Sequence, residues 1–321
     1  MLTLLALVIM QYFYYGARTL VLSGICIAVS LAAEIISLRF MKQKFTADDL
    51  TCISDALILC LMLPAVIDYK IAVIGCVFAI VAAKNIFGGR KNMIFSPAAA
   101  AYVFMLTSWK NHVLMFSEPH IHTGIFDKAE HLVSSASHGF NTSGRMNYTD
   151  FEILMGNVSG PTGTVSILLL IVSAVILILR RDISFGAFAG TMTGTGFLAF
   201  FVPVCSNQFD SFKYTLSTNM ILFAAIYIVS DRRIAPKRSY YAFFYGFFLS
   251  VFSYIFVITT AKENAIVILS VLFAPVALGF RNLENRIDGL VKEEKDAEEL
   301  WEAIKSGEFE IPEAEEVLSD E

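Results

Sequence analysis

The stretch from Leu20 to Leu38 reads LVLSGICIAVSLAAEIISL and decides the fold class. It carries one charged residue, Glu34, among small and branched apolar residues. A straight helix needs roughly 20 mostly apolar residues to cross the hydrocarbon core of a bilayer, so this stretch predicts a transmembrane helix. The rest of the chain has the same character, since 56% of its 321 residues are hydrophobic, 28 are Phe and its mean hydropathy is +0.64. We therefore expect an all-α polytopic membrane protein.

Apolar runs recur along the chain and predict about ten transmembrane helices. The third and fifth runs are short, and one contains Pro64 while the other begins at Pro97, which indicates broken helices that line a cavity. The first run lacks a basic flank and a small-residue cleavage site, so we expect a retained helix and no secretory signal. The runs are Leu2 to Tyr15, Leu20 to Leu38, Ile53 to Ile67, Ile71 to Phe87, Pro97 to Trp109, Thr164 to Leu179, Ser184 to Pro203, Thr215 to Ser230, Tyr240 to Thr260 and Ala265 to Phe280.

The distribution of Lys and Arg predicts the orientation of these helices. With the N-terminus in the cytoplasm, the inner ends receive about twice as many basic residues as the outer ends, as the positive-inside rule requires. An even number of crossings then places both termini in the cytoplasm. The long loop from Lys110 to Gly163 is external.

Four regions follow from this pattern. A first five-helix half covers 1–110, an external loop 111–163, a second five-helix half 164–290 and an acidic cytoplasmic tail 291–321. The tail holds thirteen acidic residues and three lysines, so we expect disorder with one short amphipathic helix from Ala297 to Ile304. The alternative for this tail is a docking peptide for a basic partner.

The external loop contains two elements that together favour a cofactor site. Ser134, Ser135, Ala136 and Ser137 form a small, hydroxyl-rich run. A glycine turn follows, with Gly156, Gly160 and Gly163, and opens an apolar helix near Ser166. Glycines allow close backbone approach, and free amides at a helix N-terminus favour a phosphate or an electron-rich ring edge. The alternatives are a solvated serine loop and a plain loop-to-helix turn.

In the order of these motifs the chain resembles the RnfD subunits of the Rnf ion-translocating oxidoreductases and, more distantly, the NqrB subunits of the sodium-pumping NADH:quinone reductases. The colinear match runs to about Arg286 and includes Gly88-Gly89, Phe95-Ser96-Pro97-Ala98, Ser230-Asp231 and Ala274-Pro275. Several letters depart from the family pattern. They are His131 at the acidic position of the attachment motif, His138 in place of Pro, Thr164 in place of an acidic residue and Arg232 in place of Pro.

This resemblance implies a function, a cofactor and a set of partners. Ser137 would carry covalent FMN through a phosphoester, with Ser135 and Ala136 permitting close approach of a flavin transferase. It also implies inverted five-helix repeats, leaves open a second, non-covalent flavin, and places the chain in a bacterial inner membrane. The chain would be a membrane subunit of a ferredoxin:NAD oxidoreductase type complex that translocates Na⁺ or H⁺ with other Rnf-type subunits, and would not be catalytic alone. No nucleic-acid partner is predicted.

Charged residues within apolar runs are candidates for the ion path, because a carboxylate at mid-membrane costs ~2.5 kcal/mol or more. Asp55 lies beside Ser54 and precedes Pro64, and it could coordinate an ion or carry a proton. Asp231 is a second candidate, with capping of a helix end beside Arg232 and Arg233 as its alternative role. Glu34 is expected to snorkel toward the membrane surface.

Two functions of other classes remain open. A flavin-free transporter or channel for a small solute or ion could use the same scaffold. An external metal sensor could use the five loop histidines, His112, His120, His122, His131 and His138, although no Cys or paired carboxylate accompanies them, and we predict no metal site. The five cysteines are scattered singly, so neither disulfides nor an iron-sulfur site is expected.

Overall fold

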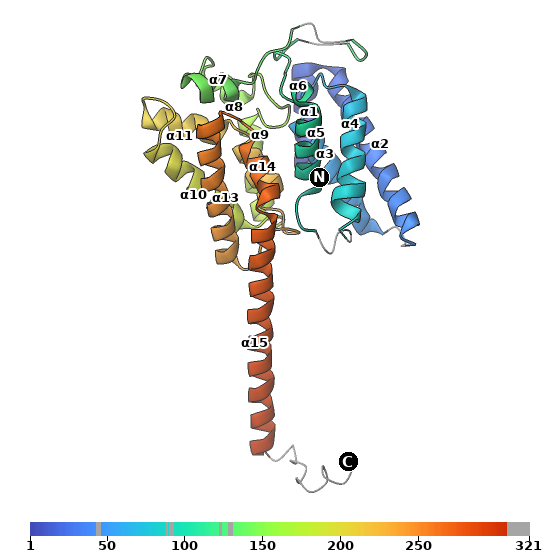
Figure 1. Ribbon diagram of the computed structural model, residues 1–321, viewed down its shortest axis with the longest axis vertical. Coiled ribbons are helices and arrows are strands. Elements are labelled where there is room, and N and C mark those ends of the chain that lie inside the picture. The colour runs from blue at the N-terminus through green and yellow to red at the C-terminus, as the bar shows by residue number, and fades with distance from the viewer. Residues whose placement is uncertain (43–45, 88, 90–92, 122–123, 128–130, 307–321) are drawn as a thin grey trace.

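The computed structural model describes residues 1–42, 46–87, 89, 93–121, 124–127 and 131–306. Across these ranges helices are the only extended regular elements, accompanied by isolated β-bridges between Phe116 and Val133 and between Ile183 and Asp231. Figure 1 shows a helical domain with short helices α6, α7 and α8 at one end and the long helix α15 leaving from the other. The protein is an all-helical membrane protein.

The N-terminal group of helices is packed around a short central helix, α3. The bounds in this group are α1 Leu2–Tyr15, α2 Ala17–Phe40, η1 Ala47–Leu50, α3 Thr51–Met62, α4 Tyr69–Val77 with its π-helical continuation η2 Phe78–Asn85, and α5 Pro97–Ser108. The helix α3 ends two residues before Pro64, and α5 begins with Pro97 directly after its N-cap Ser96. A proline cannot donate a backbone hydrogen bond, so both positions suit a helix boundary.

The remaining helices form the outer cap, the second group and the C-terminal rod. They are α6 Lys110–Val113, α7 Ala136–Ser143, α8 Asp150–Met155, α9 Ile167–Leu179, α10 Phe185–Phe201, α11 Gln208–Ser217, α12 Ile221–Ala224 with its π-helical continuation η4 Ala225–Val229, α13 Ser239–Thr260, α14 Ala265–Leu272 and α15 Ala274–Ser306. Two helices, α2 and α13, are by themselves long and apolar enough to cross a membrane.

Two predicted spans are broken in the structure. The pair α11 and α12 bends by 52°, and the pair α14 and α15 bends by 49°. At the first break Asn219 and Met220 both adopt the left-handed conformation, with φ of 54° and 55°. Hydropathy continues across this break, so the predicted uninterrupted run from Thr215 to Ser230 is wrong at residues 218–220.

The tail also differs from its prediction. Helix α15 continues to Ser306, whereas disorder was expected from residue 291; residues 307–321 lie outside the described part of the chain. The sequence after Val291 is rich in Glu, Lys, Ala and Leu, which are strong helix formers. Local propensity therefore favours helix where low hydrophobicity alone had suggested disorder.

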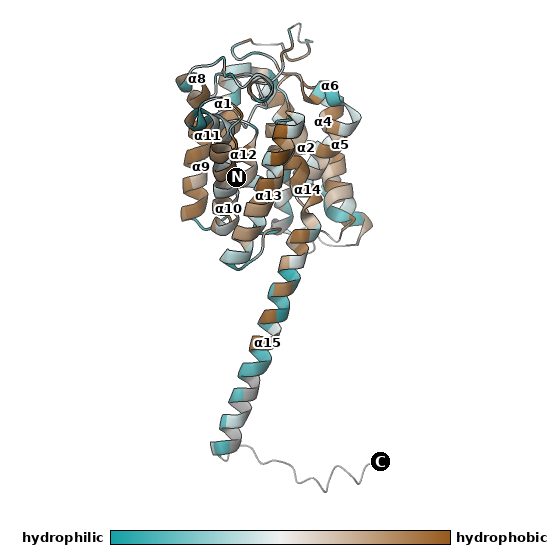
Figure 2. Ribbon diagram, turned by 60° about the vertical axis from the view of Figure 1, so that its left-hand side comes forward, coloured by the Kyte–Doolittle hydropathy of each residue, from teal (hydrophilic) through white to brown (hydrophobic). Residues whose placement is uncertain are grey.

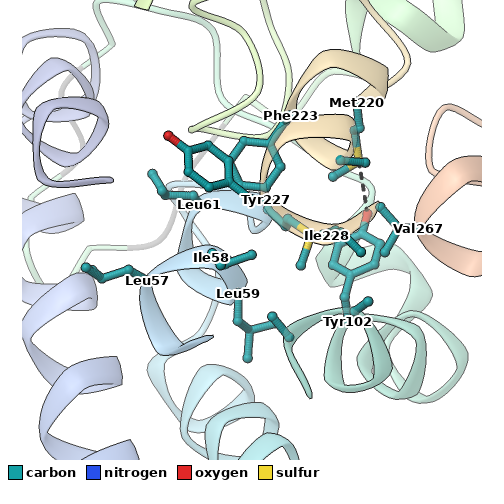
Figure 3. Close-up of a cluster of buried hydrophobic side chains, with 14 of the residues drawn as sticks. Leu57, Ile58, Leu59, Leu61, Tyr102, Met220, Phe223, Tyr227, Ile228 and Val267 are labelled. Carbon is teal, nitrogen blue, oxygen red and sulfur yellow. Dashed lines mark hydrogen bonds between the residues drawn. The ribbon is translucent and has the colours of Figure 1, made fainter. Parts of the chain in front are cut away.

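The core lies where the short and broken helices meet. Figure 3 shows side chains from α3, α5, α12, η4 and α14 converging on one cluster, with the Tyr102 hydroxyl 4.0 Å from the Met220 sulfur. The two groups of helices thus share one apolar core. Its labelled members are Leu57, Ile58, Leu59, Leu61, Tyr102, Met220, Phe223, Tyr227, Ile228 and Val267.

Candidate functional site

The serine run forms the start of helix α7 at the end of the molecule occupied by the outer loop (Figure 1). Ser135 is the N-cap residue, and its hydroxyl oxygen accepts a hydrogen bond from the His138 N–H at 3.1 Å. Ala136 and Ser137 therefore occupy the first turn, where backbone N–H groups have no partner within the helix. Ser134 is exposed and Ser137 is half-buried. A phosphate on Ser137 would lie at the N-terminus of α7.

A buried carboxylate lies beneath this turn. The Glu263 side chain, in a residue that is 4% exposed, accepts a hydrogen bond from the Ser135 hydroxyl. The His138 ring nitrogen Nδ1 lies 3.1 Å from the Ala261 carbonyl oxygen, two residues before Glu263. These contacts fix α7 onto the turn between α13 and α14.

Burial raises the pKa of the Glu263 carboxyl from 4.5 to about 7. Hydrogen bonds from Ser135 and Ser137 and the charge of His138 act in the opposite direction and favour the ionised form. Glu263 can therefore gain or lose a proton near neutral pH, directly below the predicted flavin acceptor. Glu263 was not among the residues predicted from the sequence, where the available signal was a carboxylate at the end of an apolar run.

The break between α11 and α12 supplies the third wall of the site. The Asn219 backbone N–H donates to the Ser137 hydroxyl oxygen at 3.2 Å. The Asn219 side chain exchanges hydrogen bonds with Asn141 on α7, at 2.5 and 3.2 Å. Asn tolerates the left-handed conformation better than most residues, which suits this broken turn. Neither Asn141 nor Asn219 was identified from the sequence.

The glycine turn lies directly against the serine run. The Ala136 N–H donates to the Ser159 carbonyl oxygen at 2.9 Å, and the Ser159 hydroxyl donates to the Ser134 carbonyl oxygen at 3.2 Å. Gly156 ends α8 with a φ of 93°, and a Cβ there would lie 2.9 Å from the Ser166 Cα. A Cβ on Gly160 would meet the Val165 side chain at 2.9 Å.

The amides of this turn have partners other than those predicted. The Gly163 N–H donates to the Leu61 carbonyl oxygen at 2.7 Å, and the Gly156 N–H donates to the Glu152 carbonyl oxygen at 2.8 Å. The Thr162 hydroxyl bonds the Leu63 carbonyl oxygen at 3.1 Å. Helix α3 ends early and leaves carbonyl groups unpaired, and this turn satisfies them. The expected free amides for a phosphate or ring edge are thus absent at Gly156 and Gly163, and the turn instead buttresses α3.

The residues around Ser137 fit a covalently attached phosphate. The Ser137 oxygen is reachable, and the N-terminus of α7 favours negative charge. The next position but one, Gly139, has nothing within 4 Å of where a Cβ would be, so the face beside the acceptor is open. Ser135 points into the protein toward Glu263 and is committed to capping.

The candidate ion-path residues lie at the opposite end of the molecule. Asp55 is fully buried, and its carboxylate lies 2.6 Å from the Arg233 Nη2 atom. The same guanidinium contacts Asp231, with Nη2 to Oδ2 at 2.6 Å. The structure therefore joins Asp55 and Asp231 through one arginine. Ser54 is not part of this group, because its hydroxyl donates to the Thr51 carbonyl oxygen at 2.7 Å.

Glu34 is not at the membrane surface, so the expectation that it snorkels is wrong. It pairs with Lys84 at 2.7 Å, and both side chains are 1% exposed. The Asn85 amide donates to the second carboxylate oxygen at 3.2 Å. A lysine within the apolar run from Ile71 to Phe87 was the signal that a buried partner for Glu34 existed.

The loop histidines do not converge. His112 lies 3.7 Å from Asp68, His120 packs against Tyr14 at a ring distance of 5.2 Å, and His138 caps the turn at Ala261. His122 lies outside the described residues. Among the residues that are described, no three His, Cys, Asp or Glu side chains form a group that could hold a metal ion.

Comparison with known proteins gives consistent matches. The family model described as the NQR2, RnfD, RnfE family matches residues 1–280. The Na⁺-translocating ferredoxin:NAD⁺ oxidoreductase complex of Acetobacterium woodii has a subunit, designated D, that is 31% identical over 173 residues, which are 54% of this chain and 53% of that protein. The subunit of the same designation in the ion-translocating oxidoreductase complex of Vibrio cholerae serotype O1 is 34% identical over 120 residues, 35% of this chain and 34% of that protein. The matched region spans about half of the first relative and a third of the second.

The region matched by the family model contains both groups of helices, the serine run, the glycine turn and Glu263. It ends within α15, shortly after the bend at Phe273. Both relatives are subunits of ion-translocating oxidoreductase complexes. The chain belongs to the NQR2, RnfD and RnfE family.

Proposed function

We propose that this chain is the membrane subunit of an ion-translocating electron-transport complex and that it holds FMN on its outer face through a phosphoester to Ser137. The observation that carries the proposal is the position of the Ser137 hydroxyl in the first turn of α7, with a protonatable carboxylate, Glu263, below it. FMN, when bound, supplies the electron-transfer chemistry. The chain's own residues hold and orient it.

The division of roles follows from the contacts. Ser137 anchors the phosphate, and the N-terminus of α7 stabilises its negative charge. Ser135 and Asn219 hold the turn in place through Glu263 and the Ser137 oxygen. Glu263 would hold a proton more firmly when a phosphate anion is attached above it, because a nearby like charge disfavours the ionised carboxylate.

The proposal includes the topology and an ion path. It has ten crossings in two inverted halves, with both termini in the cytoplasm of a bacterial inner membrane, partner subunits of the Rnf type and a flavin transferase. The Na⁺ or H⁺ path passes Asp55 and Asp231 with Ser54 nearby. Arg233 neutralises both carboxylates, so a cation can reach them only when the arginine moves away.

In-gel ultraviolet fluorescence of the denatured chain, expressed with a flavin transferase, tests the proposal. We expect a fluorescent band for the wild type and its complete loss in Ser137→Ala, since a phosphoester survives denaturation. Ser134→Ala is the matched control and retains the band, because Ser134 is exposed and lies outside the contacts with Glu263 and Asn219. A band that persists in Ser137→Ala contradicts the proposed anchor. A wild-type chain without fluorescence favours a flavin-free transporter.

A further inference from the structure

Helix α15 extends well beyond the domain in which it begins. Its base is fixed, because the Glu284 carboxylate accepts hydrogen bonds from the Lys237 and Arg238 N–H groups at 2.9 and 2.7 Å, and Asp288 pairs with the Arg238 guanidinium at 2.5 Å. Figures 1 and 2 show the remainder projecting from the end opposite α7. At 1.5 Å per residue, the part from Asp288 to Ser306 is roughly 27 Å long.

This rod carries an apolar seam at heptad spacing. Its positions are alternately three and four residues apart, and all but one hold apolar residues: Phe280, Leu283, Ile287, Leu290, Glu294, Ala297, Trp301 and Ile304. Leu283 is 49% exposed, and Leu290 and Trp301 are each 65% exposed. Such a seam on one helix is typically covered by a second helix whose side chains pack between its own. Figure 2 shows the hydrophobic patches along an otherwise polar α15.

The charges beside the seam argue against a second copy of this chain as the covering helix. Two copies in one membrane, with the same orientation, would bring their α15 helices together in parallel and in register. Glu294 would then face Glu294 across the seam, and Glu293 would face Glu298 of the other copy. Like charges at these positions are destabilising, and no arginine or lysine of the seam compensates them.

We propose that α15 between Leu283 and Ile304 is a docking helix for a helical segment of another protein, whose leucine or isoleucine seam packs on it and whose Lys or Arg residues meet Glu293, Glu294 and Glu298. The charged position at Glu294 sets the register of the pair. The family match ends at residue 280, so this surface lies in the chain's own C-terminal extension. It does not depend on the flavin at the other end of the molecule.

The proposal is tested on the full-length chain in lipid nanodiscs with a synthetic probe. The probe is a fluorescent four-heptad peptide with Leu at its seam positions and Lys at the flanking positions. The comparison peptide has Glu in place of Lys. Fluorescence anisotropy at several salt concentrations gives the two affinities. We expect the Lys peptide to bind at least ~10-fold more tightly than the Glu peptide, with weaker binding at higher salt.

Two substitutions separate docking on the seam from simple attraction of a basic peptide to an acidic helix. Leu290→Asp lies in the seam, and Asn285→Asp adds the same charge at an exposed position on the other face. Loss of a buried leucine contact weakens binding by about 10- to 100-fold in Leu290→Asp. Asn285→Asp leaves binding unchanged or slightly tighter. Equal affinity in the two variants, or no binding of the Lys peptide to the wild type, overturns the proposal.

Two further outcomes would assign the seam to another occupant. Self-association of the wild type in nanodiscs, abolished by Leu290→Asp and retained by Asn285→Asp, replaces the proposed partner with a second copy. Trp301 emission at apolar wavelengths without any peptide, obtained as the difference between wild type and Trp301→Phe, shows that lipid already covers the seam. Water-exposed Trp301 emission that shifts to shorter wavelength when the Lys peptide binds supports docking.

Discussion

Glu263 shows how its surroundings, more than its place in the sequence, determine the behaviour of a single residue. It follows an apolar helix, where a carboxylate commonly lies in water at the membrane surface. The turn at Ala261 and the packing of α7 bury it instead, and its hydrogen-bond partners are the hydroxyls of Ser135 and Ser137. A buried carboxylate with hydroxyl partners holds its proton to a higher pH than one paired with a cation.

The pKa of Glu263 predicts how stability depends on pH. Because its folded pKa, about 7, is above the ordinary 4.5, the folded state binds the extra proton between these values. The free energy of unfolding therefore falls as pH rises from about 4.5 to about 7, by ~3 kcal/mol at most, and is flat above that range. Glu263→Gln should remove this slope in thermal unfolding midpoints measured between pH 5 and 8 in one detergent.

Glu118→Gln is the matched control, since it makes the same change at an exposed carboxylate of the outer loop. It should preserve the wild-type slope. His138 faces Glu263 and also titrates near this range, but it is present in all three proteins. The same slope in Glu263→Gln as in the wild type would show that the buried carboxyl is not the group responsible.

At the scale of elements, the closest helix pair is α10 with α13. Gly186, Gly190 and Gly194 lie four residues apart on α10 and face α13. A Cβ on Gly190 would lie 2.1 Å from the Phe243 carbonyl oxygen, and one on Gly186 would lie 2.3 Å from the Ser239 carbonyl oxygen. In lipid, where apolar side chains gain little by leaving their surroundings, small residues allow the backbone contact that holds helices together.

Gly190→Ala should therefore destabilise the protein by about 1–3 kcal/mol, because the added methyl group meets rigid backbone and must push the helices apart. Gly24→Ala on α2 is the matched control, with nothing within 4 Å of the added Cβ. It should be neutral or stabilising by up to ~1 kcal/mol, the usual gain of Ala over Gly within a helix. Thermal unfolding of both variants measures the difference. Equal effects would mean that α10 and α13 are not in backbone contact.

For the whole molecule, the arrangement of ends allows the proposed orientation to be tested with native and introduced cysteines. Cys205 is partly exposed and lies at the α7 end, where Gly144 approaches its Cα. Cys26, Cys52, Cys60 and Cys76 are buried. In spheroplasts, whose outer membrane surface is accessible, a membrane-impermeant maleimide should label Cys205, and Cys205→Ser should abolish the labelling.

The opposite end supplies the second half of this test. Lys305→Cys in the Cys205→Ser background should be labelled only after the membrane is made permeable, since α15 leaves from the end away from α7 (Figure 1). Labelling of both positions from outside would contradict the proposed topology. So would labelling of position 305 alone.

Several features of this molecule could be predicted from residues close together in the sequence. The helical character of Leu20 to Leu38 follows from an apolar run of membrane length, and the short α3 and α5 follow from Pro64 and Pro97. Other features depended on distant segments. The break at Asn219 interrupts no hydropathy signal, and it is stabilised by Asn141 and Ser137, which precede it by 78 and 82 residues.

The sequence by itself determined that this is an all-helical membrane protein of the NQR2, RnfD and RnfE family, because apolar run length, proline and short motifs act locally and are legible without coordinates. Only the tertiary structure decided which groups surround Ser137 and what the glycine turn binds. Glu263 lies 128 residues from Ser135, and the Gly163 amide reaches the Leu61 carbonyl across two helix groups. The physical reason is that buried donors and acceptors must find partners, and these partners depend on packing between segments far apart in the chain.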